Sequence, residues 1–413
     1  MRAWTNPGKW SVNPVNFAEE VVRDYELPDR VFVLDSTLRK MVETPGCNWT
    51  VEGAVDIAAM ADEIGVEFMV VNVVYGWQAP PERLLQMFEA VARLNRRFKL
   101  FGTAWLTRDS VDLVVDHGAD GVDLTRGDML QFGELYEYAR SRGVLVAKEF
   151  SVGSRIEHVP PSELARQINS VLQKDLTYVG IHENKGPTTP DAWRYYMKAL
   201  RRAIVRDTIL IPHIHNMFGQ ATAATCAAVT GGANGVDVTM NGIATDSGLG
   251  ALEEVVVSLE AFYGVETGIR LEKLRDYSEV VSRATGIPVP PNKPLVGDHA
   301  FLVEYAPFVQ EVLEARVHGN EHDGVHLIAP SLVGHHYILV WGQATISETG
   351  ATKEKLAQMG LPHDQDAAQR LNEAIRAKIE KRAAYPRFLT EAEVEELAAD
   401  LFAQPQSTVR IGA

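Results

Sequence analysis

"VFVLDSTL", residues 31–38, is the first run of this chain with the composition of a buried β-strand, and seven similar runs follow it. Branched and aromatic residues dominate these runs, and several are almost continuously apolar, as expected for strands buried on both faces. The other seven runs span 68–76, 98–106, 121–127, 145–153, 176–184, 209–216 and 235–243. The sequence therefore predicts a parallel sheet of buried strands.

Amphipathic helical patterns separate these strands. In "PERLLQMFEAVARLNRR" (81–97), Leu84, Phe88 and Val91 recur at helical spacing. "PPSELARQINSVLQK" (160–174) begins with Pro and Ser and ends with Lys, as helix termini prefer. Eight strand–helix units predict a (β/α)8 TIM barrel. A doubly wound sheet is the alternative, but the Gly-rich phosphate loop that usually follows its first strand is absent here.

The rhythm of strands and helices changes beyond about residue 265. A helical pattern, "LEKLRDYSEVVSRATG" (271–286), is followed by a Pro-rich connector and then by further helical patterns up to about residue 402. We therefore expect a barrel with an appended, mainly helical C-terminal extension. The predicted ranges are an N-terminal extension (1–29), a catalytic barrel (30–270), a linker subdomain (271–345) and a helical subdomain (346–413).

Composition and charge limit the classes of function. The net charge of −15 argues against a nucleic-acid partner, which requires clustered Lys and Arg. The two cysteines, Cys47 and Cys226, cannot form a disulfide framework, so we expect a reducing, cytoplasmic location. The N-terminus lacks an apolar signal segment, and no apolar run reaches the length of a membrane span. We expect neither a membrane nor a nucleic acid as partner.

Polar residues gather at the predicted carboxyl ends of the strands, where barrels of this kind carry their chemistry. Arg39 and Lys40 stand side by side after the first predicted strand, where two adjacent cations require an anionic partner. That partner is either a substrate anion or a carboxylate of the chain itself, such as Glu43, Glu149 or Glu183. The remaining candidates at the strand ends are Asn72, Tyr75, Arg126, Lys148, Glu149, His182, Glu183, Asn184, Lys185, His213, His215, Asn216 and Asn241.

The motif "HIHN" (213–216) is the sharpest local feature of this set. Histidines two positions apart on a strand point to the same side, so His213 and His215 can converge on one metal ion. The alternative is structural, with His213 packed beneath the site. The sequence thus allows a divalent metal, Zn, Mn or Mg, at this strand end, and also allows none.

Several motifs together resemble the family of 2-isopropylmalate, homocitrate and citramalate synthases, whose barrel hydroxymethylglutaryl-CoA lyase shares. They are "DSTLR", "HIHN" with the following "GQATAATCAAVTGGANGVDVTMNGI", "GALEEVVVSL", "NKPLVGDHAF" and "PSLVGHHYILVWG". The resemblance covers most of residues 30–400. It implies Claisen- or aldol-type chemistry in which a divalent metal holds a 2-oxo acid and an arginine stabilises the developing oxyanion.

Residue by residue, the resemblance implies that Arg39 is the arginine and that His213 and His215 are metal ligands. The third family ligand, an Asp directly after the arginine, falls on Lys40. Other departures fall on the same end of the barrel. An acidic residue of the family falls on Val70, "Glu-Asp" on Gly153-Ser154, "Asp-Thr" on Glu183-Asn184, a histidine near Phe308, and "Gly-Glu-Arg-x-Gly-Asn" on "ATDSGLG". Lys40 cannot act as a metal ligand, because a cation does not coordinate a cation. Since the other departures cluster at the same end of the barrel, we expect an active site that differs from that of the family.

Three physical explanations of Lys40 stay open. Its ammonium group can take the place of the metal and, with Arg39, bind a carboxylate or oxyanion. Alternatively, burial and the neighbouring Arg39 can lower its pKa enough for Schiff-base chemistry. In the third explanation, a metal persists on His213 and His215, with a glutamate as the replacement ligand and Lys40 turned away or carbamylated.

We therefore expect an enzyme that makes or breaks a carbon–carbon bond next to a carbonyl in a small anionic 2-oxo or hydroxy carboxylate. The predicted catalytic residues are Arg39, Lys40, Glu149 and His182, and the predicted substrate contacts are Asn72, Tyr75, Arg126 and Asn184. The alternatives are a non-catalytic carboxylate-binding relative and an ordinary metal-dependent synthase. The resemblance also implies a homodimer.

Overall fold

The structure is a computed structural model that describes residues 5–73, 80–125, 129–152, 159–319, 325–382 and 387–403. The chain divides into two compact units. The first extends from Val12 to Pro290, and the second combines the short segment Thr5–Ser11 with the chain from Pro291 onward. In the described residues, no helix is both long and apolar enough to cross a membrane.

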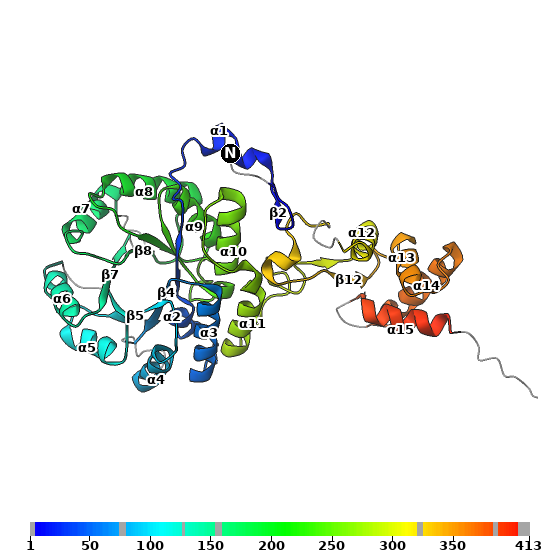
Figure 1. Cartoon of the computed structure of the whole chain (residues 1–413), viewed down its shortest axis with the longest axis horizontal. Coiled ribbons are helices and arrows are strands. Elements are labelled where there is room, and N and C mark those ends of the chain that lie inside the picture. Colours follow the sequence, from blue (N-terminus) through cyan, green and yellow to red (C-terminus); the bar gives the residue numbers. More distant parts are fainter. Residues whose placement is uncertain are drawn as a thin grey trace, which may run out of the picture. The chain divides into compact units, whose positions relative to one another are not determined.

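The first unit is a closed barrel of eight parallel strands, which confirms the predicted fold (Figure 1). Each strand pairs with its sequence neighbours, and the last pairs with the first to close the ring. The strands are β3 (Phe32–Asp35), β4 (Phe68–Asn72), β5 (Lys99–Ala104), β6 (Gly121–Leu124), β7 (Leu145–Ser151), β8 (Val179–Glu183), β9 (Leu210–Ile214) and β10 (Gly235–Val238).

Helices surround the strands, and their starts follow ordinary capping chemistry (Figure 1). Thr50, Thr107 and Thr189 each cap a helix by accepting an N–H from the residue three positions later. The helices of this unit are α1 (Glu19–Val22), α2 (Thr37–Met41), α3 (Val51–Ile64), α4 (Pro81–Ala92), α5 (Arg108–Asp116), α6 (Met129–Ser141), α7 (Pro161–Val171), α8 (Pro190–Ala203), α9 (Ala221–Thr230), α10 (Leu252–Ser258) and α11 (Leu274–Thr285).

An apolar cluster fills the part of the barrel interior that is nearer the amino ends of the strands. Its buried members are Leu34, Phe68, Val70, Phe101, Ala147, Tyr178 and Ile211, which come from five of the eight strands and, for Tyr178, from the residue directly before β8. Side chains alternate between the two faces of a strand, so the residues two positions further along also point inward. This alternation decides which polar residues enter the mouth of the barrel.

The first strand is shorter than predicted, and this corrects the position of the two cations. β3 ends at Asp35, and Arg39 and Lys40 lie on the short helix α2 instead of on the strand. The Asp35 carboxylate accepts the backbone N–H of Thr37 at 2.7 Å and the hydroxyl of Tyr277 at 2.6 Å. Asp35 thereby satisfies a free N–H at the start of α2 and turns the chain over the barrel mouth.

The second unit is mixed α/β with a small three-stranded sheet, β11 (Leu302–Val303), β12 (Ile338–Trp341) and β13 (Leu389–Thr390). Its helices confirm the predicted helical extension. They are α12 (Ala306–Val317), α13 (Gly350–Gln358), α14 (Gln365–Glu380) and α15 (Glu391–Leu401). The hairpin of β1 (Thr5–Asn6) and β2 (Trp10–Ser11) joins this unit through a bridge between Trp10 and Ile328.

Candidate active site

A layer of polar side chains lies next to the apolar cluster, on the side of the carboxyl ends of the strands. Asn72 follows Val70 by two positions, and Glu149 follows Ala147 in the same way, so both point into the barrel. The layer consists of Asn72, Thr103, Asp123, Glu149, His182, His213 and Asp237, and all except His182 are buried. Seven of the eight strands thus contribute to one polar site, where barrels of this class act.

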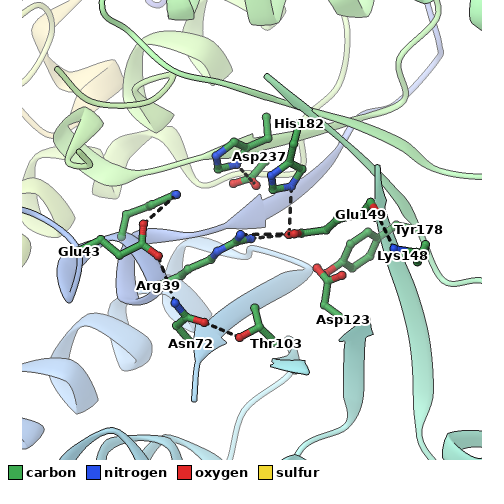
Figure 2. Close-up of polar contacts among 12 residues, drawn as sticks. Arg39, Glu43, Asn72, Thr103, Asp123, Lys148, Glu149, Tyr178, His182 and Asp237 are labelled. Atoms are coloured by element: carbon green, nitrogen blue, oxygen red, sulfur yellow. Dashed lines mark hydrogen bonds and ion pairs between the residues drawn. The ribbon is translucent and has the colours of Figure 1, made fainter. Parts of the chain in front are cut away.

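Arg39 enters this layer from α2 and forms a buried ion pair with Glu149 of β7 (Figure 2). Arg39 Nη1 lies 2.5 Å from Glu149 Oε1, and each side chain is 8% exposed. Burial by itself would raise the pKa of the Glu149 carboxyl, but Arg39 and His182 hold it well below its usual range. Burial by itself would lower the pKa of the Arg39 guanidinium, but Glu149 and other carboxylates hold it well above its usual value. Both groups are therefore charged.

Lys40 has a carboxylate partner of its own. Its Nζ lies 3.0 Å from Oε2 of Glu43, which follows α2, and the two side chains are 6% and 14% exposed. Asn72 Nδ2 donates to Glu43 Oε1 at 3.1 Å, and Thr103 Oγ1 donates to Asn72 Oδ1 at 2.5 Å (Figure 2). Burial and the neighbouring Arg39 lower the pKa of the Lys40 ammonium, while Glu43 opposes them.

His213 and His215 of the "HIHN" motif converge through their Nε2 atoms, which lie 3.3 Å apart. His215 Nδ1 lies 3.2 Å from the Thr245 carbonyl oxygen, which only accepts, so this nitrogen carries the proton. His213 Nδ1 lies 2.6 Å from Asp237 Oδ2. Burial and the charge of Lys40 lower the pKa of His215 to about 4, and burial lowers that of His213 well below its usual value. Both imidazoles are neutral, and the bare Nε2 of His215 faces the Nε2 of His213.

His182 connects this pair to the arginine. Its Nε2 lies 3.0 Å from Glu149 Oε1, the oxygen that Arg39 also contacts. The rings of His182 and His213 stack with centroids 4.1 Å apart and planes within 3°. Arg39, Glu149, His182, His213 and Asp237 therefore form one continuous set of contacts across the mouth.

The residues fit a divalent metal only in part. Two nitrogens bound to one ion at about 2.0–2.1 Å and a tetrahedral angle stand roughly 3.3–3.4 Å apart, as the Nε2 atoms of His213 and His215 do. The resemblance puts the third ligand at Lys40, which is a cation. Glu149 is engaged by Arg39 and His182, and so offers no free carboxylate. The ligand set implied by the resemblance is thus incomplete among the described residues.

A second grouping, His182, His213 and Asp237, brings three possible ligand atoms within 4.8 Å of one another. The lone pairs of an imidazole lie in its ring plane. Because the rings of His182 and His213 are stacked, their lone pairs lie in parallel planes and cannot meet at one ion. This grouping does not fit a metal either.

Glu183 is separated from the histidine pair. It lies one position beyond His182 on β8 and therefore faces outward, where it accepts the Trp193 indole N–H of α8 at 3.2 Å and the hydroxyl of Thr188. Asn184 follows at the end of β8 and is exposed. Tyr75 and Arg126, the other predicted substrate contacts, lie outside the described residues.

Sequence reasoning missed three members of the polar layer, Thr103, Asp123 and Asp237. Asp123 is fully buried and accepts the Tyr178 hydroxyl at 2.8 Å, and burial together with Glu149 raises its pKa well above the usual value. Burial raises the pKa of Asp237 to about 6. A signal was present, because both aspartates stand in "Gly-Val-Asp" at the same place of a strand, 121–123 and 235–237.

The barrel and its layer of buried ionic side chains at the carboxyl ends of the strands define an enzyme-like (β/α)8 protein. Comparison with solved structures agrees on the fold. The hydroxymethylglutaryl-CoA lyase of Bacillus subtilis superposes with a TM-score of 0.57 at 16% identity, covering 64% of this chain and 96% of the lyase.

Sequence comparisons identify the family. Residues 128–281 match the HMGL-like family model. A putative (R)-citramalate synthase of Methanopyrus kandleri is 33% identical over 94% of this chain and 75% of its own length. A homocitrate synthase of the same organism is 29% identical over 93% of this chain and 96% of its own length. The 2-isopropylmalate synthase of Methanocaldococcus jannaschii is 28% identical over 93% and 74%. This chain belongs to the HMGL-like family that contains these synthases, as its motifs implied.

Proposed function

We propose that this chain is an enzyme that makes or breaks a carbon–carbon bond next to a carbonyl group in a small 2-oxo or hydroxy carboxylate. Family membership supports the reaction class. The observation that carries the proposal is the pair of buried cations, Arg39 and Lys40, at the same mouth as two neutral histidines. Such chemistry develops negative charge on oxygen, and fixed cations in a water-poor mouth stabilise that charge.

Each residue has a proposed role. Arg39 donates hydrogen bonds to the developing oxyanion, and the Lys40 ammonium provides the positive charge that a metal provides in the family. His182 moves a proton to or from the substrate, and Glu149 fixes its orientation through the 3.0 Å contact. Asn184, Tyr75 and Arg126 are the proposed substrate contacts. Asn72 acts through Glu43, because both ends of its amide are already bonded.

The primary test is turnover of a panel of 2-oxo acids, each with and without an acyl-CoA. Elemental analysis of the purified protein accompanies it. We expect turnover that Lys40→Met reduces at least about 100-fold, since a single stabiliser of a transition-state oxyanion contributes that much. About one bound Zn, Mn or Mg per chain would contradict the metal-replacing role of Lys40. Trapping of a 2-oxo acid on Lys40 by borohydride would favour the covalent explanation instead.

A gain-of-binding variant tests the same role without any activity assay. Lys40→Asp introduces a carboxylate where the family carries its third ligand, beside two imidazoles that already turn Nε2 toward each other. We expect Lys40→Asp to bind Co²⁺ with visible absorption bands, and we expect neither the wild type nor Lys40→Met to do so. Equal Co²⁺ binding by wild type and Lys40→Asp would show that Lys40 does not prevent a divalent cation from binding at this position.

One observation favours a second candidate function, a carboxylate-binding relative without catalysis. Arg39 is already paired with Glu149, and Lys40 is already paired with Glu43. A ligand-induced rise in the unfolding temperature with a 2-oxo acid, combined with no turnover in any assay, would support this candidate. The predicted homodimer is tested separately by light scattering during gel filtration.

A further inference from the structure

Glu43 stands outside the reaction roles given above, yet it holds the most distinctive residue of the site. Its two carboxylate oxygens have different partners, Lys40 Nζ at 3.0 Å on Oε2 and Asn72 Nδ2 at 3.1 Å on Oε1. A carboxylate only accepts hydrogen bonds, so the Asn72 amide must present its nitrogen to Glu43 and its oxygen to Thr103. The Thr103 hydroxyl donates to that oxygen at 2.5 Å.

These contacts form a chain, Lys40–Glu43–Asn72–Thr103, that links α2 to two neighbouring strands. Strand register supports it, because Asn72 of β4 and Thr103 of β5 are directly paired. Lys40, Asn72 and Thr103 are buried, and Glu43 is largely so. Rotation of the Glu43 carboxylate would break two contacts at once, so its position is fixed by the barrel wall.

The other charged and titratable groups around Lys40 do not replace this partner. Arg39 on the same helix repels it, and His213 and His215 of β9 are neutral. Asp237 of β10 is the other carboxylate acting on Lys40, but Asp237 is already bonded to His213 at 2.6 Å. Among the described residues, Glu43 is therefore the sole carboxylate that forms an ion pair with this ammonium group.

We propose that Glu43, held by Asn72 and Thr103, is a positioning residue that keeps Lys40 charged and fixed at the barrel mouth. This inference rests on the proposed role of Lys40 as the cation of the site. It implies that the lysine and the glutamate function as one unit. It also implies that the Schiff-base explanation requires loss of this contact, because a lysine held as an ammonium ion is not a nucleophile.

The test measures the titration of Lys40 directly, by NMR of chains labelled at lysine Cε and Nζ, with Lys40→Met identifying the signal. Removing an opposite charge at this distance should lower the proton affinity of Lys40 about tenfold or more in Glu43→Gln. Asn72→Ala, which leaves Glu43 less constrained, should produce a smaller change in the same direction. Asp276→Asn, in the exposed Lys273–Asp276 pair of the same i,i+3 spacing, is the matched control and should leave Lys40 unchanged.

Turnover provides the second readout. The alkaline limb of the activity profile should move to lower pH in Glu43→Gln and return toward the wild-type position in Glu43→Asp, which restores a carboxylate. In a Lys40→Met background, Glu43→Gln should have no further effect on the profile. If Glu43→Gln folds and leaves the titration of Lys40 unchanged, the positioning role is wrong and the proposed function stands. If Lys40→Met retains full turnover, the proposed role of Lys40 itself fails.

Discussion

Arg39 and Glu149 form a buried ion pair across the mouth of the barrel, with Nη1 2.5 Å from Oε1, although 110 positions separate them in the sequence. Together with the contact between Lys40 and Glu43, this pair accounts for the two adjacent cations. Each is balanced by a carboxylate of the chain, as one reading of the sequence anticipated. An anionic substrate must therefore compete with Glu149 for Arg39, or bind with Glu149 turned toward His182 alone.

Removal of the Glu149 carboxylate should lower the stability of the folded chain, because Arg39 would then be buried without its partner. We expect Glu149→Ala to lower the free energy of unfolding by about 3–5 kcal/mol, because it leaves a buried, uncompensated charge. Glu149→Gln retains hydrogen-bonding capacity and should cost less. The measurement is urea unfolding followed by circular dichroism. Glu163→Ala, which breaks an exposed pair with Arg166, is the control and should leave the urea midpoint in place.

Two glutamates on neighbouring strands should differ sharply in their effect on turnover. Glu149 faces the polar layer, whereas Glu183 faces α8 and accepts the Trp193 indole N–H. We expect Glu149→Gln to reduce kcat at least about 100-fold, because it removes the carboxylate that orients His182, and general acid–base catalysis by that histidine contributes that much. Glu183→Gln preserves the outward contact and should leave kcat within about twofold. Equal losses in the two variants would contradict the assignment of Glu149 to the reaction.

His215 should make the protein less stable in mild acid. Its pKa is about 4 in the folded chain, against an ordinary value of 6.5, so between these values the unfolded chain binds a proton that the folded chain does not. Stability from His215 is therefore present above pH 6.5 and is lost as the pH falls toward 4. The pKa of Asp237 is about 6 in the folded chain, against an ordinary value of 3.8, so its effect on stability has the opposite pH dependence. The stability that Asp237 contributes is lost as the pH rises through 6.

A matched variant isolates the contribution of His215. Between pH 7 and pH 5, the wild type should lose roughly 1–2 kcal/mol more unfolding free energy than His215→Gln. His363→Gln, at an exposed position, is the control. If wild type and His215→Gln show the same change between these pH values, His215 is not held neutral in the folded chain.

Asp123 should behave as a neutral acid. Burial and the nearby Glu149 raise its pKa well above the usual value, and Tyr178 donates to it at 2.8 Å. Asp123→Asn retains a neutral acceptor of the same shape and should change the free energy of unfolding by less than about 1 kcal/mol. Asp123→Ala leaves the buried Tyr178 hydroxyl unpaired and should cost about 1–3 kcal/mol. A large loss in Asp123→Asn, measured by urea unfolding at neutral pH, would show that the carboxylate is ionised.

The strand order and the histidine pair could both be predicted from the sequence. Near-continuous apolar runs at regular spacing leave few arrangements other than a barrel, and the spacing of two in "HIHN" fixes a shared side on any strand. Asp123 and Asp237 were missed although alternation from Gly121 and Gly235 would have placed both in the barrel interior. The location of Lys40 on a helix was not foreseen, because the turn at Asp35 depends on Tyr277 from a distant part of the chain.

The sequence by itself determined the barrel and the family, because periodicity and motif spacing are local properties. Only the tertiary structure decided which charges meet. Glu149 and Glu183 lie on adjacent strands and are chemically alike, yet one faces Arg39 and the other Trp193. That difference follows from the phase of side-chain alternation along each strand of the barrel. Closure of the ring then brings residues far apart in sequence within a few ångströms and excludes the water that would otherwise screen their charges.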